Sequence, residues 1–168
     1  SFWSLDELPP SASKNPAATF ADLFEDSVRI RMRSDVPVGV CLSGGLDSTA
    51  IICAAARQRG ETAAGQSESL QAFCYMAKEF DESKYITDTL TQTRAQLRQL
   101  ETSPAELWSD LRQLLWFQDE PVHTMTAVVG YQLMRLAASN GIRVVLNGQG
   151  ADETIGGYSS YFQDYWVS

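Results

Sequence analysis

Long apolar runs, a leader peptide and an excess of basic residues are all missing from this sequence. No apolar run approaches the roughly 20 residues that a membrane-spanning helix requires. Residues 1–7 lack the basic and apolar regions of a secretory signal peptide. The formal net charge of −8 disfavours binding to nucleic acid or to an anionic membrane. We therefore expect small-molecule substrates, and an anionic ligand would need backbone amides or a metal ion to offset the charge.

Cysteine and histidine are scarce. The three cysteines, Cys41, Cys53 and Cys74, have no CxxC spacing, which argues against a disulfide framework and against a zinc site. We expect small core residues in a reducing compartment, and hence a cytoplasmic protein. A single histidine such as His123 is more often structural than catalytic.

Apolar strands alternate with amphipathic helices along the chain. The expected strands cover 36–42, 70–76, 95–101 and 142–146. The expected helices cover 16–33 after an Asn15 cap, 46–59 ended by Gly60, a segment capped by Asp81, a segment begun by a capping box at Ser103, and 126–139 stopped by Asn140-Gly141. This alternation predicts an α/β fold, a parallel sheet with helices on both faces. Ligands of such sheets bind beyond the carboxyl ends of the strands.

The first glycine-rich turn is Ser43-Gly44-Gly45-Leu46-Asp47-Ser48, directly after an expected strand. It lacks the lysine of a Walker A loop, but its glycines allow positive φ and close backbone approach. Successive N–H groups at a helix start form a nest for an anion. Asp47 would repel a phosphate unless Mg²⁺ lies between them. The alternative for Asp47 alone is a first-turn acid that favours the helix dipole.

The first turn and one later stretch resemble signatures of known enzymes. SGGLDS resembles the pyrophosphate-binding signature of the ATP pyrophosphatases, and VVLNGQGADETIGGY, residues 144–158, resembles the second signature of glutamine-dependent asparagine synthetases. Residues 80–85, the triplet 119–121 and the opening FWSLDELP are similar to the same family, in the same order. Asp47 and Asp152 are 105 residues apart (152 minus 47). The resemblance covers nearly the whole chain.

The resemblance implies the three-layer ATP pyrophosphatase fold and an ATP-dependent amide-forming ligase. Aspartate would attack the α-phosphate of ATP, and ammonia would then displace AMP to give asparagine. ATP and Mg²⁺ are the implied cofactors, and aspartate and ammonia from glutamine are the implied substrates. Two alternatives stay open: a relative that adenylates another acid, of the β-lactam synthetase or peptide-cyclase type, or a non-catalytic nucleotide-binding module.

The resemblance also implies roles for individual residues. The implied catalytic residues are Asp47, Gln149, Asp152 and Glu153, and Asp47 and Asp152 would share Mg²⁺. The implied ATP- and pyrophosphate-binding residues are Cys41, Ser43, Gly44, Gly45, Asp47, Ser48, Tyr75, Gly148 and Gly150. Ordinary strand packing remains the alternative for Cys41 and Tyr75. Gln149 departs from several members that carry Glu there, because an amide orients a substrate but does not act as a base.

The resemblance implies a domain organisation as well. Residues 1–15 are expected to be a linker or arm after an N-terminal glutaminase domain that this chain does not contain. Residues 16–168 would be the synthetase domain, cut short at its C-terminus, and whether this piece is active alone is left open. A starting Met is absent, which also suggests a piece of a longer protein. A homodimer is an open expectation.

Overall fold

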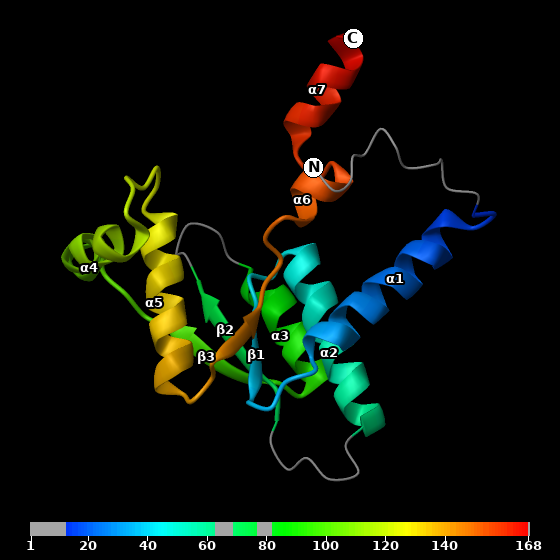
Figure 1. Cartoon of the computed structure of the whole chain (residues 1–168), viewed down its shortest axis with the longest axis horizontal. Coiled ribbons are helices and arrows are strands. Elements are labelled where there is room, and N and C mark those ends of the chain that lie inside the picture. Colours follow the sequence, from blue (N-terminus) through cyan, green and yellow to red (C-terminus); the bar gives the residue numbers. More distant parts are fainter. Residues whose placement is uncertain (1–12, 63–68, 77–81, 168) are drawn as a thin grey trace.

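A four-stranded parallel sheet forms the centre of the molecule (Figure 1). The computed structural model describes residues 13–62, 69–76 and 82–167. The strands are β1 (Val38–Cys41), β2 (Gln71–Tyr75), β3 (Gln96–Leu100) and β4 (Val144–Leu146). Their order is β3-β2-β1-β4, and every pairing is parallel. All carboxyl ends therefore lie at one edge of the sheet.

Helices cover both faces of this sheet (Figure 1). One layer contains α1 (Pro16–Arg31), α2 (Leu46–Thr62) and α3 (Ser83–Thr93), and the opposite layer contains α4 (Pro104–Gln118) and α5 (Thr126–Ser139). The two short helices α6 (Ala151–Ile155) and α7 (Ser159–Val167) extend beyond the carboxyl edge. The three-layer α/β prediction is confirmed.

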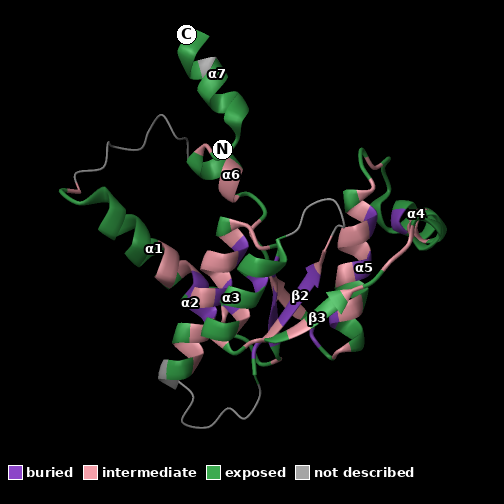
Figure 2. Cartoon of the chain, turned by 180° about the vertical axis from the view of Figure 1, so that it is seen from behind, coloured by how far each residue is buried: buried purple, intermediate pink, exposed green. Residues whose placement is uncertain are grey.

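The core lies between β1, β2 and the helices on either side, as the buried colour in Figure 2 shows. Its largest fully buried side chains are Phe73, Leu42, Ile52, Val40, Val128 and Cys74. A Cβ on Gly39 would lie 2.7 Å from Phe73 Cε2 and 3.1 Å from Ile142 Cγ2. The glycine in β1 is thus required by close packing rather than by its backbone dihedrals.

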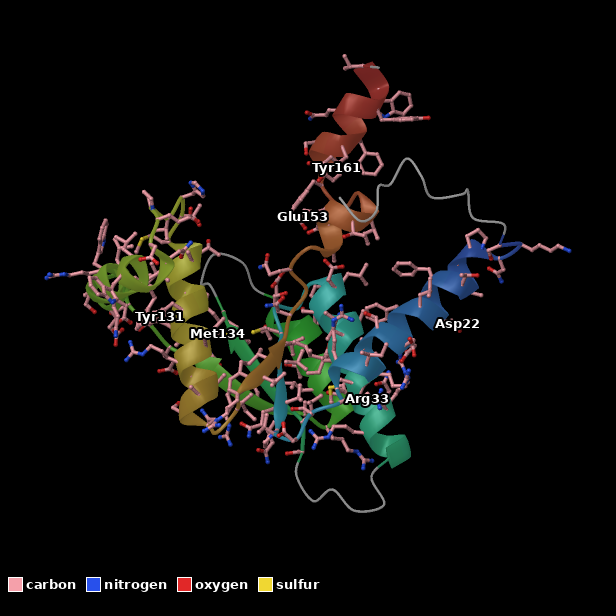
Figure 3. All side chains as sticks on the ribbon, in the orientation of Figure 1. Asp22, Arg33, Tyr131, Met134, Glu153 and Tyr161 are labelled. Carbon is pink, nitrogen blue, oxygen red and sulfur yellow. The ribbon has the colours of Figure 1, made fainter. Side chains whose placement is uncertain are left out.

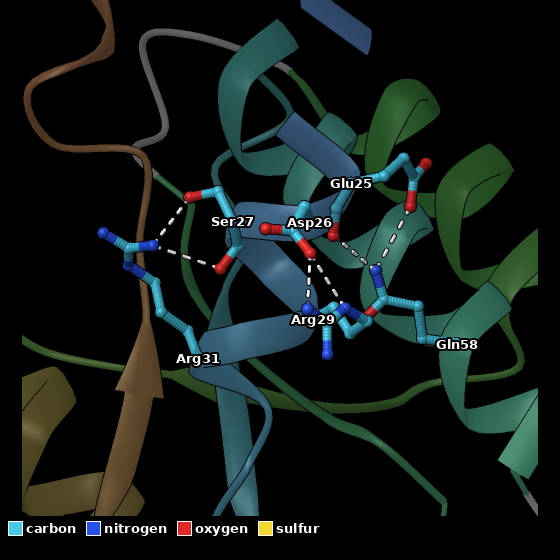
Figure 4. Close-up of polar contacts among 6 residues, drawn as sticks. All are labelled: Glu25, Asp26, Ser27, Arg29, Arg31 and Gln58. Atoms are coloured by element: carbon cyan, nitrogen blue, oxygen red, sulfur yellow. Dashed lines mark hydrogen bonds and ion pairs between the residues drawn. The ribbon is translucent and has the colours of Figure 1, made fainter. Parts of the chain in front are cut away.

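Helix α1 is attached to α2 by polar contacts (Figure 4). The Gln58 side-chain amide donates to the Glu25 carbonyl at 2.8 Å, and Arg57 forms an ion pair with the Glu25 carboxylate. On the opposite face, Asp110 of α4 accepts from Gln132 and pairs with Arg135, both of α5. One acidic residue thus contacts two partners in each of the helix pairs α1–α2 and α4–α5.

Three of the predicted helix boundary signals, at Asn15, Ser103 and Asn140-Gly141, are confirmed. Asn15 Oδ1 accepts from Ala18 N at 3.2 Å, and Ser103 with Glu106 forms a reciprocal capping box. Helix α5 ends at Asn140, followed by Gly141 with φ +76°. Side-chain caps satisfy amides that the helix itself cannot, which is why these local signals predict boundaries well.

Other boundaries were predicted wrongly. Gly60 lies inside α2, which continues to Thr62, because an exposed helix tolerates a glycine at a cost of about 1 kcal/mol. The first helix ends at Arg31 rather than Arg33. The strands β1 and β4 are shorter than the apolar runs that contain them, since only Val38–Cys41 and Val144–Leu146 pair with neighbouring strands. Helices α6 and α7 were not predicted, and the expected Asp81 cap and most of the arm at 1–15 lie outside the described residues.

Two negative expectations concern the part of the chain that the structure describes. Within it, no helix has both the length and the apolar character needed to cross a bilayer. All three cysteines are free thiols, as their spacing predicted.

Candidate active site

The two glycine-rich turns leave the sheet from neighbouring strands. In the register, Val38 is opposite Val144 and Val40 is opposite Leu146, so β1 and β4 lie side by side. The chain moves from β1 to β2 and β3 on one side, whereas β4 is added on the other side of β1. The gap between β1 and β4 is therefore the switch point at which sheets of this kind bind ligands.

The turns also touch each other. A Cβ on Gly148 would lie 3.0 Å from Asp47 Cβ and 3.3 Å from Ser48 N. Any side chain at position 148 would push the second turn away from the first turn of α2. The glycine thus allows two segments that are distant in sequence to form one surface.

Hydrogen bonds within the first turn determine its shape. Ser48 Oγ accepts from Ser43 N at 3.1 Å and lies 2.9 Å from Ser43 Oγ. Ser43 Oγ also accepts from Gly45 N at 3.3 Å, while Gly44 has φ +83°. Both hydroxyls that were predicted to contact phosphate are therefore bonded inside the turn. They hold the backbone amides in place, and contact with an anion would exchange some of these bonds.

The second turn is organised by its own backbone and one side chain. Asn147 Oδ1 accepts from Gln149 N at 3.2 Å, and Gly148 O accepts from Ala151 N at 3.3 Å. Gly150 precedes α6 with φ +91°, a conformation that favours glycine. The predicted residues Gly148, Gln149 and Gly150 thus form one tight turn beside Asp47.

The acidic residues of α6 face a different neighbour. The Asp152 carboxyl group lies against the Gly157 backbone, and Glu153 accepts a hydrogen bond from Tyr158. Among the described residues, no group of three or more His, Cys, Asp or Glu side chains is arranged to hold a metal ion. Mg²⁺ commonly takes only one or two carboxylates and completes its shell with phosphate oxygens and water. The chemistry of two carboxylates suits such an ion, and the shared role of Asp47 and Asp152 stays a prediction.

A cavity of about 750 Å³ adjoins both turns. Asp47, Gly148 and Gln149 line it, whereas the described side chains of Asp152 and Glu153 do not. Its other walls come from α1, α2, β4 and α6: Phe20, Phe24, Ser27, Val28, Arg31, Leu46, Ala50, Ile51, Val145, Leu146, Asn147, Ala151, Thr154 and Ile155.

Arg31 is the cationic residue of this cavity wall. Its Nη1 donates to Ser27 O at 3.1 Å and to Ser27 Oγ at 2.6 Å (Figure 4). Arg33, two residues further on, is absent from the wall, and it is labelled at the lower end of α1 in Figure 3. The cavity thus combines a carboxylate, an amide and a guanidinium within largely apolar walls.

The predicted nucleotide residues Cys41 and Tyr75 end the adjacent strands β1 and β2. Both are half-buried, and burial raises the pKa of the Cys41 thiol. Leu42 N donates to Phe73 O at 2.8 Å, which continues the pairing of the strands up to the first turn. Nothing in this geometry separates a nucleotide contact from strand packing, so their role stays a prediction.

The sequence interpretation assigned no role to Glu82, which the structure brings to the first turn. A Cβ on Gly44 would lie 2.8 Å from Glu82 Cβ and 3.3 Å from Glu82 Oε2. Glu82 occupies the N-cap position of α3 without a capping side-chain bond. The signal was available, since residues 80–85 already resembled a family motif.

Fold and turns together define a domain of the ATP pyrophosphatase class. The family model described as "Asparagine synthase" matches residues 19–168, and the chain belongs to this family.

Two asparagine synthetases and one protein named an amidase are similar to most of the chain. "Asparagine synthetase [glutamine-hydrolyzing] 1" of Bacillus subtilis is 33% identical over 142 residues, which cover 83% of this chain and 21% of the relative. A putative asparagine synthetase of Methanocaldococcus jannaschii is 29% identical over 165 residues, 98% of this chain and 31% of the relative. "Amidase chry2" of Gibberella zeae is 26% identical over 149 residues, 83% of this chain and 22% of the relative. The chain thus spans between about a fifth and a third of these relatives.

Proposed function

We propose that this chain is the synthetase portion of an asparagine-forming ligase. A side-chain carboxylate oxygen of aspartate attacks the α-phosphorus of ATP, the bond between that phosphorus and the bridging oxygen to the β-phosphate breaks, and pyrophosphate leaves. Ammonia then attacks the acyl carbon, AMP leaves with the former carboxylate oxygen, and the nitrogen loses a proton. The products are asparagine, AMP and pyrophosphate.

The observation that carries the proposal is the contact of Gly148 with Asp47 and Ser48 at the switch between β1 and β4. One surface then offers both the amides of the first turn and the polar groups of the second. Charge that develops on departing pyrophosphate is best stabilised by such preorganised donors. The family match and the asparagine synthetase relatives support the same reaction class.

Individual roles follow from this arrangement. Ser43, Gly44 and Gly45 bind the β- and γ-phosphates through their backbone, after partial exchange of the bonds within the turn. Asp47 and Asp152 would hold Mg²⁺, which neutralises phosphate charge when bound. Gln149 orients the acceptor without accepting a proton, because a neutral amide is not a base.

The ammonia source and the surroundings of the chain belong to the same proposal. Residues 1–15 would connect to a glutaminase domain, and residues 16–168 would be part of the synthetase domain. The printed name of the Bacillus subtilis relative, glutamine-hydrolyzing, favours glutamine as the nitrogen donor. A cytoplasmic location and a homodimer also belong to this proposal.

A different acceptor acid is the second candidate. Much of the cavity wall is apolar, and one relative is named an amidase. Free aspartate carries three charged groups, whereas Arg31 is the cationic residue of the wall. An acid with an apolar body would therefore also fit this cavity.

The experiment is ATP–pyrophosphate exchange with radiolabelled pyrophosphate, run with the intact protein that contains this chain, Mg²⁺ and aspartate. We expect aspartate-dependent exchange, and AMP rather than ADP when an ammonium salt is added. Asp47→Asn should lower the exchange rate about 100-fold or more, because removing one preorganised charge or donor near a leaving group slows a reaction by about this factor. Asp22→Asn, an exposed change on α1, is the matched control.

Three outcomes decide between the candidates. Exchange with an apolar acid but not with aspartate would favour the second acceptor class. Unchanged exchange in the Asp47→Asn variant would remove the metal role of that residue. Absence of exchange with every acid, although ATP binds, would favour the non-catalytic module.

A further inference from the structure

Residues 156–158, Gly-Gly-Tyr, follow α6 directly and contact both of its acidic residues. Gly156 ends the helix with φ +73°, and its C-cap position reverses the chain. Gly157 N then donates to Asp152 O at 3.0 Å. The reversal returns the backbone and the next side chain to the surface of α6 that carries Asp152 and Glu153.

Tyr158 contacts the second of these acids. Its hydroxyl donates to Glu153 Oε1 at 2.9 Å. The Tyr161 ring packs edge-on against the Tyr158 ring, with centroids 5.6 Å apart, and Figure 3 labels Glu153 and Tyr161 close together at the junction of α6 and α7. The hydrogen bond to Glu153, together with burial and the charges of Glu153 and Asp152, raises the pKa of Tyr158. The phenol therefore remains a proton donor across the neutral pH range.

Gly157 accommodates the first acid. A Cβ at position 157 would clash with the Asp152 carboxyl group, since it would lie 2.8 Å from Asp152 Cγ and 3.1 Å from Asp152 Cα. Real side chains do not approach so closely, so any residue larger than glycine would turn the Asp152 carboxylate out of its present direction. The glycine is required by this carboxylate and not by a turn alone.

We infer that residues 156–158 form a positioning segment that fixes the directions of the Asp152 and Glu153 carboxylates for the acceptor end of the site. The inference rests on the proposed function, in which Asp152 would hold Mg²⁺, and on the catalytic role that the family resemblance implies for Glu153. None of the three residues needs to touch substrate. A phenol that donates to one oxygen of Glu153 removes rotamer freedom and leaves the other oxygen for the ammonium group of an acceptor or for incoming ammonia. Gly157 acts differently on Asp152: because it has no side chain, the carboxylate can lie in a direction that a Cβ at position 157 would block.

The first test is Tyr158→Phe, compared with Tyr161→Phe. Each change removes only one hydroxyl, but only Tyr158 bonds to Glu153. We expect Tyr158→Phe to lower kcat for exchange about tenfold, the weight of one hydrogen bond to a charged group, and to leave KM for ATP unchanged. Tyr161→Phe should stay within about twofold of the unchanged chain in both constants. Equal kcat in the two variants would overturn the inference.

The second test is Gly157→Ala, with Gly60→Ala as the matched control because a Cβ on Gly60 meets nothing within 4 Å. Displacement of the Asp152 carboxylate should raise the Mg²⁺ concentration needed for half-maximal exchange about tenfold or more in the first variant and not in the second. An unchanged Mg²⁺ requirement in a folded Gly157→Ala chain would contradict the role given to Gly157. If this variant does not fold, the Tyr158→Phe comparison still decides the inference.

A spectroscopic readout separates the inference from the proposed function. In a chain labelled with ¹³Cζ-tyrosine, the Tyr158 resonance is identified by its loss in Tyr158→Phe. Glu153→Gln should shift this resonance at constant pH, whereas Asp22→Asn should not. A shift without exchange in the unchanged chain would overturn the proposed function but keep the contact. Exchange without such a shift would overturn the inference alone.

Discussion

The two glycine-rich turns at the carboxyl edge of the sheet differ in the contacts that hold them in place. The first turn follows Leu42, which is 1% exposed, and leads into α2, whose Ser48 and Ile52 are buried. The second turn follows the half-buried β4 and leads into α6, a helix of five residues of which none is buried. One turn is thus anchored in the core, and the other is placed by contacts at the surface.

This difference suggests that the first turn is held rigidly, whereas the second turn can adjust its position. Amides that stabilise a leaving group must be preorganised, which burial and the bonds between Ser43 and Ser48 provide. The acids of α6 contact Gly157 and Tyr158 instead. Changes in the core should therefore unfold the chain, whereas changes in the second turn should alter activity with little loss of stability.

The largest expected effect compares equivalent leucines before the two turns. Leu42→Ala should lower the free energy of unfolding by about 3 kcal/mol, because a fully buried leucine leaves a cavity. Leu146→Ala should cost about 1 kcal/mol, since β4 is half-buried and its surroundings can relax. Urea unfolding measures both values. Equal losses would show that the two turns are anchored alike.

The second prediction concerns how the free energy of unfolding changes with pH because of a thiol buried at the centre of the sheet. Burial raises the pKa of Cys74 from 9.0 to about 11. Between these values the unfolded chain loses a proton that the folded chain keeps, so the free energy of unfolding falls as pH rises through this range. The expected loss is on the order of 2 kcal/mol. Cys74→Ala should reduce the slope of this profile between pH 9 and 11, and an unchanged slope would contradict the burial effect.

The third prediction separates the turns from each other. Gly148→Ala places a Cβ 3.0 Å from Asp47 Cβ, so the second turn has to move away by a few tenths of an ångström. Exchange should slow about tenfold because small misplacements of reacting groups are costly, while the urea midpoint changes little. Gly130→Ala, whose Cβ meets nothing within 4 Å, is the control. Full activity in the Gly148→Ala variant would contradict the proposal that the two turns form one surface.

The smallest expected effect compares hydroxyls within the two turns. Ser48→Ala removes the acceptor for Ser43 N and a donor to Gly45 O, at a cost of about 1 kcal/mol in stability. Thr154→Ala removes an exposed bond to Gly150 O and should cost less than about 0.5 kcal/mol. Thermal unfolding midpoints rank the two. The reverse ranking would place the firmer anchor in the second turn.

Local signals were the most reliable part of the sequence. The cap at Asn15 and the box at Ser103 depend on contacts within four residues, and both are confirmed. The prediction that the helix ends at Gly60 was wrong, because glycine only lowers helix propensity and the helix continues to Thr62. Helix α7 was missed because its aromatic side chains, including Tyr165 and Trp166, face solvent and give no buried stripe to recognise.

By itself the sequence determined the α/β class, the family and the two glycine turns, because strand and helix periodicity and turn chemistry are encoded within short windows. Only the tertiary structure decided that β4 joins β1, that Gly148 touches Asp47, and that Tyr158 holds Glu153. The first two contacts depend on how strands separated by about a hundred residues pair, whereas the bond between Tyr158 and Glu153 joins residues five apart and depends on the chain reversal at Gly156. Such pairing is set by the burial of the whole sheet and not by any one segment.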